Sequence, residues 1–409
     1  MFDARQRVLP NGIKLITIKK DTKLAAFHAA VNIGAMYESN NERGISHFIE
    51  HMLFKGTMSR NNKKLNIDLE TLGGEYNAYT DNTSTVYSVT SLREELEKSV
   101  DIISDMLMNS IFPQEEIEKE REVILSEIRS SKDDIEDYSF DRINKIAFKK
   151  SALRYNVAGN EKDISKFTRE DLVGFYSKYY VPNNCYISIV SPYEHEKVYQ
   201  LIYKYFNKWK SKEVKHNDII FEYNTPRKKI SSKKDIEQST ILYLFTFNGL
   251  SEKQELALRI LNHKFGGSNN SILFTKLREE RGLAYDVYTD LDLDEGVKTL
   301  YVYTSVGEEN LKTAVGVIED CIDKVKNGDI IFKDDMVSLM KKVLKTAVAF
   351  TLEDPTDIGN YVLHQSIKGE DIYKLINDIE KIETIKKEDI YEVAKIVFNN
   401  PTIHILKRG

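Results

Sequence analysis

The chain has 409 residues, of which 41% are hydrophobic and 30% charged, and its formal net charge at pH 7 is −5. This balance is typical of a globular protein, and the length suffices for two or three domains. The mild acidity argues against nucleic acid or a membrane surface as a partner, because both attract strongly basic patches.

Cysteine content and the N-terminal sequence bear on the compartment. Cys185 and Cys321 are the two cysteines of the chain and lie far apart in sequence, which argues against a disulfide framework and against a cysteine-based zinc site. Two buried thiols in a reducing compartment are expected instead. The N-terminus lacks a secretion-signal pattern, and no window approaches the roughly 18 apolar residues of a membrane span. We therefore expect a cytoplasmic protein.

The predicted elements occur twice in the same order. In the first half, an apolar strand begins at Leu24, a helix follows over 44–56, paired strands follow over 76–90, and a long charged helix begins at Pro113. In the second half, the strand, helix and strand pair recur over 240–250, 253–267 and 285–306. Segments in which β-branched and aromatic residues alternate with polar ones lie next to segments in which apolar residues recur at helical spacing. This combination predicts an α+β fold. The recurrence predicts two similar α/β-sandwich domains that arose by internal duplication.

The boundary between the halves is marked by composition. The segment from Trp209 to Gln238 is polar and charged and contains Pro226, which is typical of a linker. We predict an N-terminal domain over 1–212, a linker over 213–236 that adds a strand, and a C-terminal domain over 237–409.

The stretch "SHFIEHMLFKGT", residues 46–57, contains the candidate catalytic and metal-binding residues. The apolar side chains that share one helical face are Ile45, Phe48, Ile49, Met52 and Leu53. His47, Glu50 and His51 then lie together on the opposite face, because residues three or four apart are neighbours on a helix. Histidines at this spacing can share one zinc ion, and the intervening glutamate can serve as a general base. A chance cluster is the alternative, but its position on an amphipathic helix favours the metal.

A third zinc ligand is required, since catalytic zinc usually has three protein ligands and one open position. The helix that begins at Pro113 contains Glu120 and Glu127, which are seven apart and therefore share a face. Spacing alone does not choose between them, and an ordinary solvated acidic face would look the same.

The stretch "GISHFIEHMLFKGT" resembles the active-site helix of the pitrilysin and mitochondrial processing peptidase family, the inverzincins. "EVILSEI" is similar to the family segment that holds the third ligand. The resemblance therefore implies Glu127 as that ligand and Glu120 as a glutamate that supports catalysis without binding the metal. It extends over essentially the whole chain and implies the LuxS/processing-peptidase-like metallopeptidase fold.

Two further segments resemble substrate-contacting parts of that family. "LGGEYNAYTDNTSTVYSVT" is similar to its edge strand, which implies that Asn77 and Ala78 pair with the substrate backbone. "GGSNNSILFTKLREERGLAYDVYT" is similar to its glycine-rich loop and the arginine and tyrosine that follow, which implies that Arg278 and Tyr285 contact substrate near the scissile bond. On residue type alone they would be a helix-surface charge and an ordinary strand residue. Thr83 departs from the pattern, because relatives often have an acidic residue there.

The second half cannot form the same metal site. When the two halves are aligned on their helices, the positions of His47, Glu50 and His51 are occupied in the second half by Arg259, Asn262 and His263. His263 is therefore expected to be structural, and one zinc ion per chain is expected.

The resemblance implies a zinc endopeptidase acting on peptides or unfolded segments, in which Glu50 is the general base. Family members with two domains per chain pair to enclose a chamber, which implies a homodimer here. One alternative is a non-catalytic peptide-binding or structural subunit of a hetero-oligomeric processing peptidase. Another is a zinc amidase for small molecules, which the edge-strand motif disfavours because a small amide has no backbone to pair with a strand.

Overall fold

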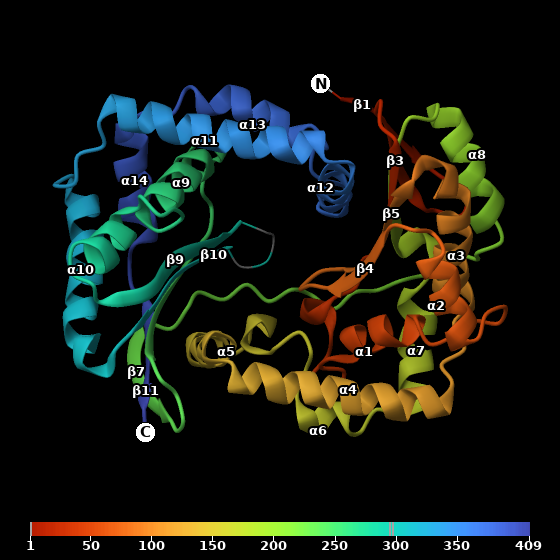
Figure 1. The fold of residues 1–409 in the computed structure, drawn as a ribbon, viewed down its shortest axis with the longest axis horizontal. Helices are drawn as coiled ribbons and strands as arrows, with labels where there is room; N and C mark the ends of the chain where they lie inside the picture. Colours follow the sequence, from red (N-terminus) through yellow and green to blue (C-terminus); the bar gives the residue numbers. More distant parts are fainter. Residues whose placement is uncertain (1, 294–295, 297) are drawn as a thin grey trace. The chain divides into compact units, whose positions relative to one another are not determined.

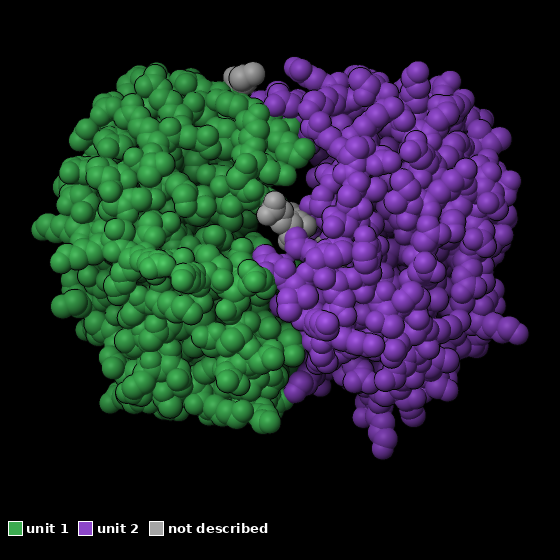
Figure 2. Space-filling model, turned by 180° about the vertical axis from the view of Figure 1, so that it is seen from behind, with its two compact units in different colours: residues 1–130, 155–218, 349–374 green, residues 131–154, 219–348, 375–409 purple. Residues whose placement is uncertain are grey.

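The structure is a computed structural model that describes residues 2–293, 296 and 298–409 (Figure 1). The chain forms two compact units, coloured separately in Figure 2. Unit 1 comprises residues 1–130, 155–218 and 349–374, and unit 2 comprises residues 131–154, 219–348 and 375–409. Each unit contains its own sheet and its own apolar core.

The sheet of unit 1 has six strands in the order β1-β2-β6-β3-β5-β4. The strands are β1 Asp3–Val8, β2 Lys14–Lys19, β3 Leu24–Val31, β4 Glu75–Thr80, β5 Thr85–Leu92 and β6 Cys185–Ser191. Only β2 and β6 pair in parallel, and the other neighbours are antiparallel. The strand with the Asn77–Ala78 pair, β4, therefore lies at an edge of the sheet.

The sheet of unit 2 repeats this topology without the first strand, in the order β7-β11-β8-β10-β9. Its strands are β7 Arg227–Lys233, β8 Ser239–Phe247, β9 Ala284–Asp292, β10 Lys298–Val306 and β11 Thr402–Arg408. The parallel pair of this sheet, β7 with β11, corresponds to β2 with β6 of unit 1. The predicted duplicated α+β fold is confirmed, and the predicted linker strand is β7.

Helices on one face of each sheet enclose the main cores. In unit 1 these are α1 Ile45–Leu53, α2 Asn62–Glu70, α3 Leu96–Asn109, α4 Gln114–Asp133, α6 Glu161–Ile164, α7 Arg169–Tyr179 and α8 His195–Phe206. In unit 2 they are α9 Glu252–Phe265, α10 Leu311–Asn327, α11 Asp334–Glu353, α13 Lys374–Ile382 and α14 Lys387–Val397. Three of the five unit boundaries fall within helices, namely α4, α11 and α13. Of the helices that the structure describes, none is long and apolar enough to cross a membrane.

The opposite face of each sheet is covered by a helix from the other half of the sequence. Helix α5, Ile135–Ala147, packs on β8 and β11 of unit 2, and α12, Pro355–Ile367, packs on β3 and β6 of unit 1. Each begins after an aspartate, Asp134 or Asp354, that accepts two backbone N–H groups of the first turn. Each compact unit therefore combines segments from both halves of the sequence. The division into an N-terminal domain over 1–212 and a C-terminal domain over 237–409 stays a prediction.

This arrangement explains the uninterrupted apolar strands. Along β3, Phe27, Ala29 and Val31 belong to the main core, whereas Ala26 and Ala30 lie among residues that contact α12. A strand that is buried on both faces reads as a continuous apolar run rather than an alternating one. Both cysteines, Cys185 and Cys321, are buried free thiols, as expected from the sequence.

Helix α12 lies close against the sheet at Gly359. A Cβ atom at this position would lie 2.8 Å from Nδ1 of His28 and 3.3 Å from Cγ2 of Val190. His28 is itself buried in β3, so its ring cannot move aside into solvent. A side chain at Gly359 would therefore push α12 away from the sheet.

We predict that Gly359→Ala lowers the free energy of unfolding by about 1–3 kcal/mol, the usual cost of overpacking a core. Gly174→Ala is the matched control, because Gly174 lies inside α7 of the same unit and its Cβ would meet nothing within 4 Å. This control should be neutral or gain up to about 1 kcal/mol. Chemical denaturation measures both, and equal stability of the two variants would contradict the tight packing of α12.

Candidate metal centre

The helix that carries the two histidines, α1, is fixed by its apolar face and its first turn. All five side chains of the predicted apolar face are buried, namely Ile45, Phe48, Ile49, Met52 and Leu53. At the N-terminus the carboxylate of Glu38 accepts the backbone N–H groups of Gly44 at 2.8 Å and Ser46 at 2.9 Å. Burial of one face and capping of the first turn together set the direction in which the polar face points.

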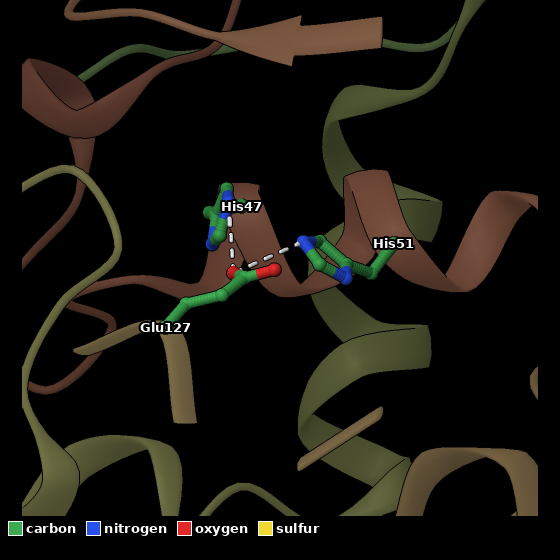
Figure 3. A group of neighbouring side chains, drawn as sticks. All are labelled: His47, His51 and Glu127. Carbon is green, nitrogen blue, oxygen red and sulfur yellow. Dashed lines mark ion pairs between the residues drawn. The ribbon is translucent and has the colours of Figure 1, made fainter. Parts of the chain in front are cut away.

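Two elements bring the candidate ligands together (Figure 3). His47 and His51 project from α1, and Glu127 projects toward them from α4. Oε2 of Glu127 lies 4.0 Å from Nε2 of His47 and 3.6 Å from Nε2 of His51. One ligand atom from each residue lies within 4.8 Å of the other two. Among the residues that the structure describes, this is the one group of histidine, cysteine or acidic side chains so arranged.

The geometry and chemistry of this group fit zinc. A tetrahedral ion with ligands at about 2.0–2.1 Å keeps its donor atoms about 3.3 Å apart. The observed separations are slightly longer and need only a small inward movement of the Glu127 side chain, which is half exposed. Two imidazoles and one carboxylate form a donor set that suits zinc.

Glu120 contacts the other side of the His51 ring. Oε2 of Glu120 lies 3.1 Å from Nδ1 of His51, and Oε1 of Glu120 lies 2.8 Å from Nζ of Lys55. The carboxylate therefore holds the proton of His51 on Nδ1 and leaves Nε2 free to face Glu127. Histidine ligands of metals are commonly oriented in this way by a second carboxylate.

The two histidines have opposite pKa shifts. Burial, and then the neighbouring His51, lowers the pKa of His47 to about 4, so His47 is neutral at pH 7. Burial acts in the same direction on His51, but the hydrogen bond to Glu120 and the charges of Glu127 and Glu50 outweigh it and raise the pKa of His51. A metal would bind His47 directly but would displace a proton from His51.

Glu50 lies between the histidines in sequence and is 9% exposed. Burial raises the pKa of its carboxyl group, and the hydrogen bond that Thr80 donates opposes this shift. The bond joins Oγ1 of Thr80 to Oε2 of Glu50 at 2.7 Å. Glu50 thus has the partly raised pKa and the fixed orientation that suit a general base.

A cavity of 330 Å³ adjoins these groups and reaches the edge strand. It is lined by Glu50, His51, Phe54, Lys55, Asn66, Tyr76, Asn77, Ala78 and Glu120. The candidate base and the predicted substrate-pairing residues of β4 therefore face one space within unit 1. Neither Lys55 nor Thr80 was singled out from the sequence. Lys55 had a local signal, since it lies one helical turn beyond His51.

The other predicted residues lie in unit 2. Nη1 of Arg278, in a π-helical turn at Phe274–Glu279, donates to the backbone oxygen of Tyr285 at 2.7 Å. The side chain of Tyr285 is 70% exposed at the start of β9. The structure thus brings Arg278 and Tyr285 to each other, and their role toward substrate stays a prediction. His263 lies near the end of α9, and a structural role for it stays a prediction too.

Comparison with known proteins covers nearly the whole chain. Residues 14–161 match the model of the insulinase family, peptidase family M16, and residues 166–343 match the model of the M16 inactive domain. An uncharacterized zinc protease of Rickettsia felis is 32% identical over 96% of this chain and 95% of that protein. The mitochondrial-processing peptidase subunit beta of Saccharomyces cerevisiae is 27% identical over 99% of this chain and 91% of its own length.

Solved structures with the same fold include two bacterial proteins. A protease from Helicobacter pylori superposes with a TM-score of 0.91 at 20% identity, over 99% of both chains. A protein described as a peptidase M16 inactive domain, from Pseudomonas fluorescens, gives a TM-score of 0.91 at 14% identity, over 100% of this chain and 98% of that one. At these identities the likeness establishes the fold alone.

The raised pKa of His51 predicts how zinc affinity depends on pH. Below this pKa the ring is protonated in the metal-free protein, so the apparent zinc affinity should fall as the pH is lowered through it. Calorimetric titration with zinc, in buffers of different ionisation enthalpy, measures the released proton.

Glu120→Gln should reduce the proton release and weaken zinc binding by roughly 10- to 100-fold, as is usual for a residue that orients a ligand. Glu118→Gln is the control, because Glu118 is an exposed residue of the same helix that pairs with Arg121. A zinc affinity that is constant across the neutral range, or equal effects of the two variants, would contradict the role of Glu120.

Proposed function

This chain belongs to the insulinase family of peptidases, M16, and we propose that it is a zinc-dependent endopeptidase that hydrolyses peptides or unfolded segments. One observation carries the proposal: His47, His51 and Glu127 converge on a single point while the buried carboxylate of Glu50 lies on the same face of α1. The relatives named zinc proteases support the same metal.

The roles of the residues follow from their positions. His47, His51 and Glu127 would hold zinc, which when bound supplies a Lewis acid that activates water and polarises the peptide carbonyl. Glu50 accepts the proton of the attacking water and later delivers it to the leaving amine. Glu120 keeps the His51 ring in the orientation that metal binding requires.

Substrate binding is proposed to use the edge of unit 1. An extended peptide would add a strand beside β4, and its backbone would pair with Asn77 and Ala78. Both residues line the cavity that Glu50 also lines. The strand would thereby place one peptide bond next to the base.

We also propose that the protein is a homodimer enclosing a chamber, with one zinc ion per chain. Arg278 and Tyr285 would then contact substrate at the zinc site of the partner, where the tyrosine hydroxyl could stabilise the oxyanion that develops on the carbonyl. Tyr285 is suited to such a contact because its side chain is mostly exposed in the single chain.

A second candidate function is that of a non-catalytic peptide-binding or structural subunit. The observation in its favour is that residues 166–343 match the M16 inactive domain. The solved structure from Pseudomonas fluorescens is described by the same name. Against it stands the full set of candidate ligands and base in residues 14–161, the segment that matches the insulinase family.

Digestion of a mixed peptide set, analysed by mass spectrometry, separates these functions. The wild-type protein should cleave internal bonds, and Glu50→Gln should retain zinc but lose at least about 100-fold in rate, since it lacks the base. A series of substrates of increasing length should show that short amides are poor substrates. Zinc-loaded protein that cleaves nothing would contradict the peptidase and favour the binding subunit, and equal cleavage by both proteins would remove Glu50 as the base.

Mixing of inactive variants tests the dimer. Glu50→Gln chains keep Tyr285, and Tyr285→Phe chains keep the zinc site and Glu50. If Tyr285 acts across the dimer, mixed dimers contain one complete site, so activity should reappear after the two inactive proteins are denatured and refolded together. Each variant refolded alone is the control. A mixture as inactive as its components, with mixed dimers demonstrated by mass spectrometry, would contradict action across subunits.

A further inference from the structure

The edge strand β4 is attached through side chains on both of its faces. Successive residues of a strand point to opposite sides. The hydroxyl of Tyr79 lies 2.7 Å from Oδ1 of Asn360 and 2.7 Å from Nε2 of His364, both on α12. The hydroxyl of Thr80, on the other face, donates to Oε2 of Glu50 on α1 at 2.7 Å.

The contact of Thr80 is the more specific of the two for chemistry. Within the described part of the chain, Thr80 is the one side chain that donates a hydrogen bond to the Glu50 carboxylate. Glu50 is 9% exposed, so solvent reaches only a small part of it. The bond engages Oε2 and leaves Oε1 as the oxygen that can accept the proton of water.

The same bond fixes the strand relative to the base. Thr80 is the last residue of β4, two residues beyond Ala78, and its backbone is held in the sheet opposite Thr85 of β5. A peptide paired along β4 would therefore be in a set position with respect to Glu50. A hydrophobic residue of the same shape at position 80 would keep the strand but remove this connection.

We propose that Thr80 is a positioning residue, whose hydroxyl orients the Glu50 carboxylate and keeps it in register with the substrate strand. This inference rests on the proposed peptidase function, in which Glu50 is the base. Thr80 does not touch the reacting atoms and acts only through Glu50.

The test compares three variants of the full-length zinc-loaded protein. Thr80→Val removes the hydroxyl at nearly constant shape, and Thr80→Ser retains it. Thr90→Val is the matched control, because Thr90 also makes a hydroxyl contact in this sheet, to Thr356 at 2.8 Å, and it is not placed in the site. Zinc content is measured for each, and kcat and KM are measured on a peptide that the wild-type protein cleaves.

Thr80→Val should lower kcat by roughly 10- to 100-fold, with KM and zinc content unchanged, because binding to β4 and the metal ligands are intact. Thr80→Ser and Thr90→Val should keep the wild-type kcat. A wild-type kcat in Thr80→Val, or an equal loss in Thr80→Ser, would overturn the proposal. A rise in KM alone would assign Thr80 to substrate binding and would also overturn it.

A second readout does not depend on activity. Crystal structures of Thr80→Val and of the wild-type protein should show a different orientation of the Glu50 carboxylate, and Thr80→Ser should show the wild-type orientation. An unchanged carboxylate in Thr80→Val would overturn the proposal even if the protein cleaves no peptide. Absence of cleavage by the wild-type protein would instead refute the peptidase function, so the two failures are distinguishable.

Discussion

The candidate site depends on one interaction, the burial of the apolar face of α1 in the core of unit 1. Five apolar side chains of this nine-residue helix are buried there. Burial of this kind contributes about 1.5–3 kcal/mol for each large side chain, as an upper estimate. It fixes the rotation of the helix about its axis, so His47 and His51 have one available direction. A helix this short would not be stable alone, and the ligand geometry therefore derives from tertiary packing.

Every other group of the site is arranged around that helix. Helix α4 brings Glu127 to one side of the His51 ring and Glu120 to the other, so a single element supplies the candidate ligand and its orienting carboxylate. The edge strand β4 supplies Thr80 to Glu50. Helix α12, which comes from the distant half of the sequence, supports the far face of the same sheet through β3 and β6. Both copies of the duplicated fold thus contribute supporting elements, and one copy contains the candidate metal ligands.

Much of the fold was predictable because its signals are local. The periodicity of apolar residues in α1 and the recurring order of elements predicted the helix and the duplication, and both are confirmed by the topology of the two sheets. The exchange of α5 and α12 was not predictable, since an amphipathic pattern does not specify which sheet a helix covers. The shared aspartate before each helix, Asp134 and Asp354, is a capping signal and does not reveal the partner sheet.

The candidate site was predictable only in part. The spacing of His47, Glu50 and His51 was enough to predict that their side chains lie together, because all three are on one helix. The spacing of Glu120 and Glu127 within α4 could not show which of them is the third metal ligand. That choice requires the distances from each carboxylate to the two ring nitrogens of His51. Thr80 carried no signal, since its partner lies 30 residues away on another element.

The measurement that tests the account most directly is an anomalous difference map at the zinc absorption edge, from crystals of the protein loaded with zinc. The account predicts one peak per chain, about 2.0–2.2 Å from a ring nitrogen of His47, a ring nitrogen of His51 and a carboxylate oxygen of Glu127. A peak at other side chains, or zinc that fails to bind while these three residues keep their positions, would contradict it.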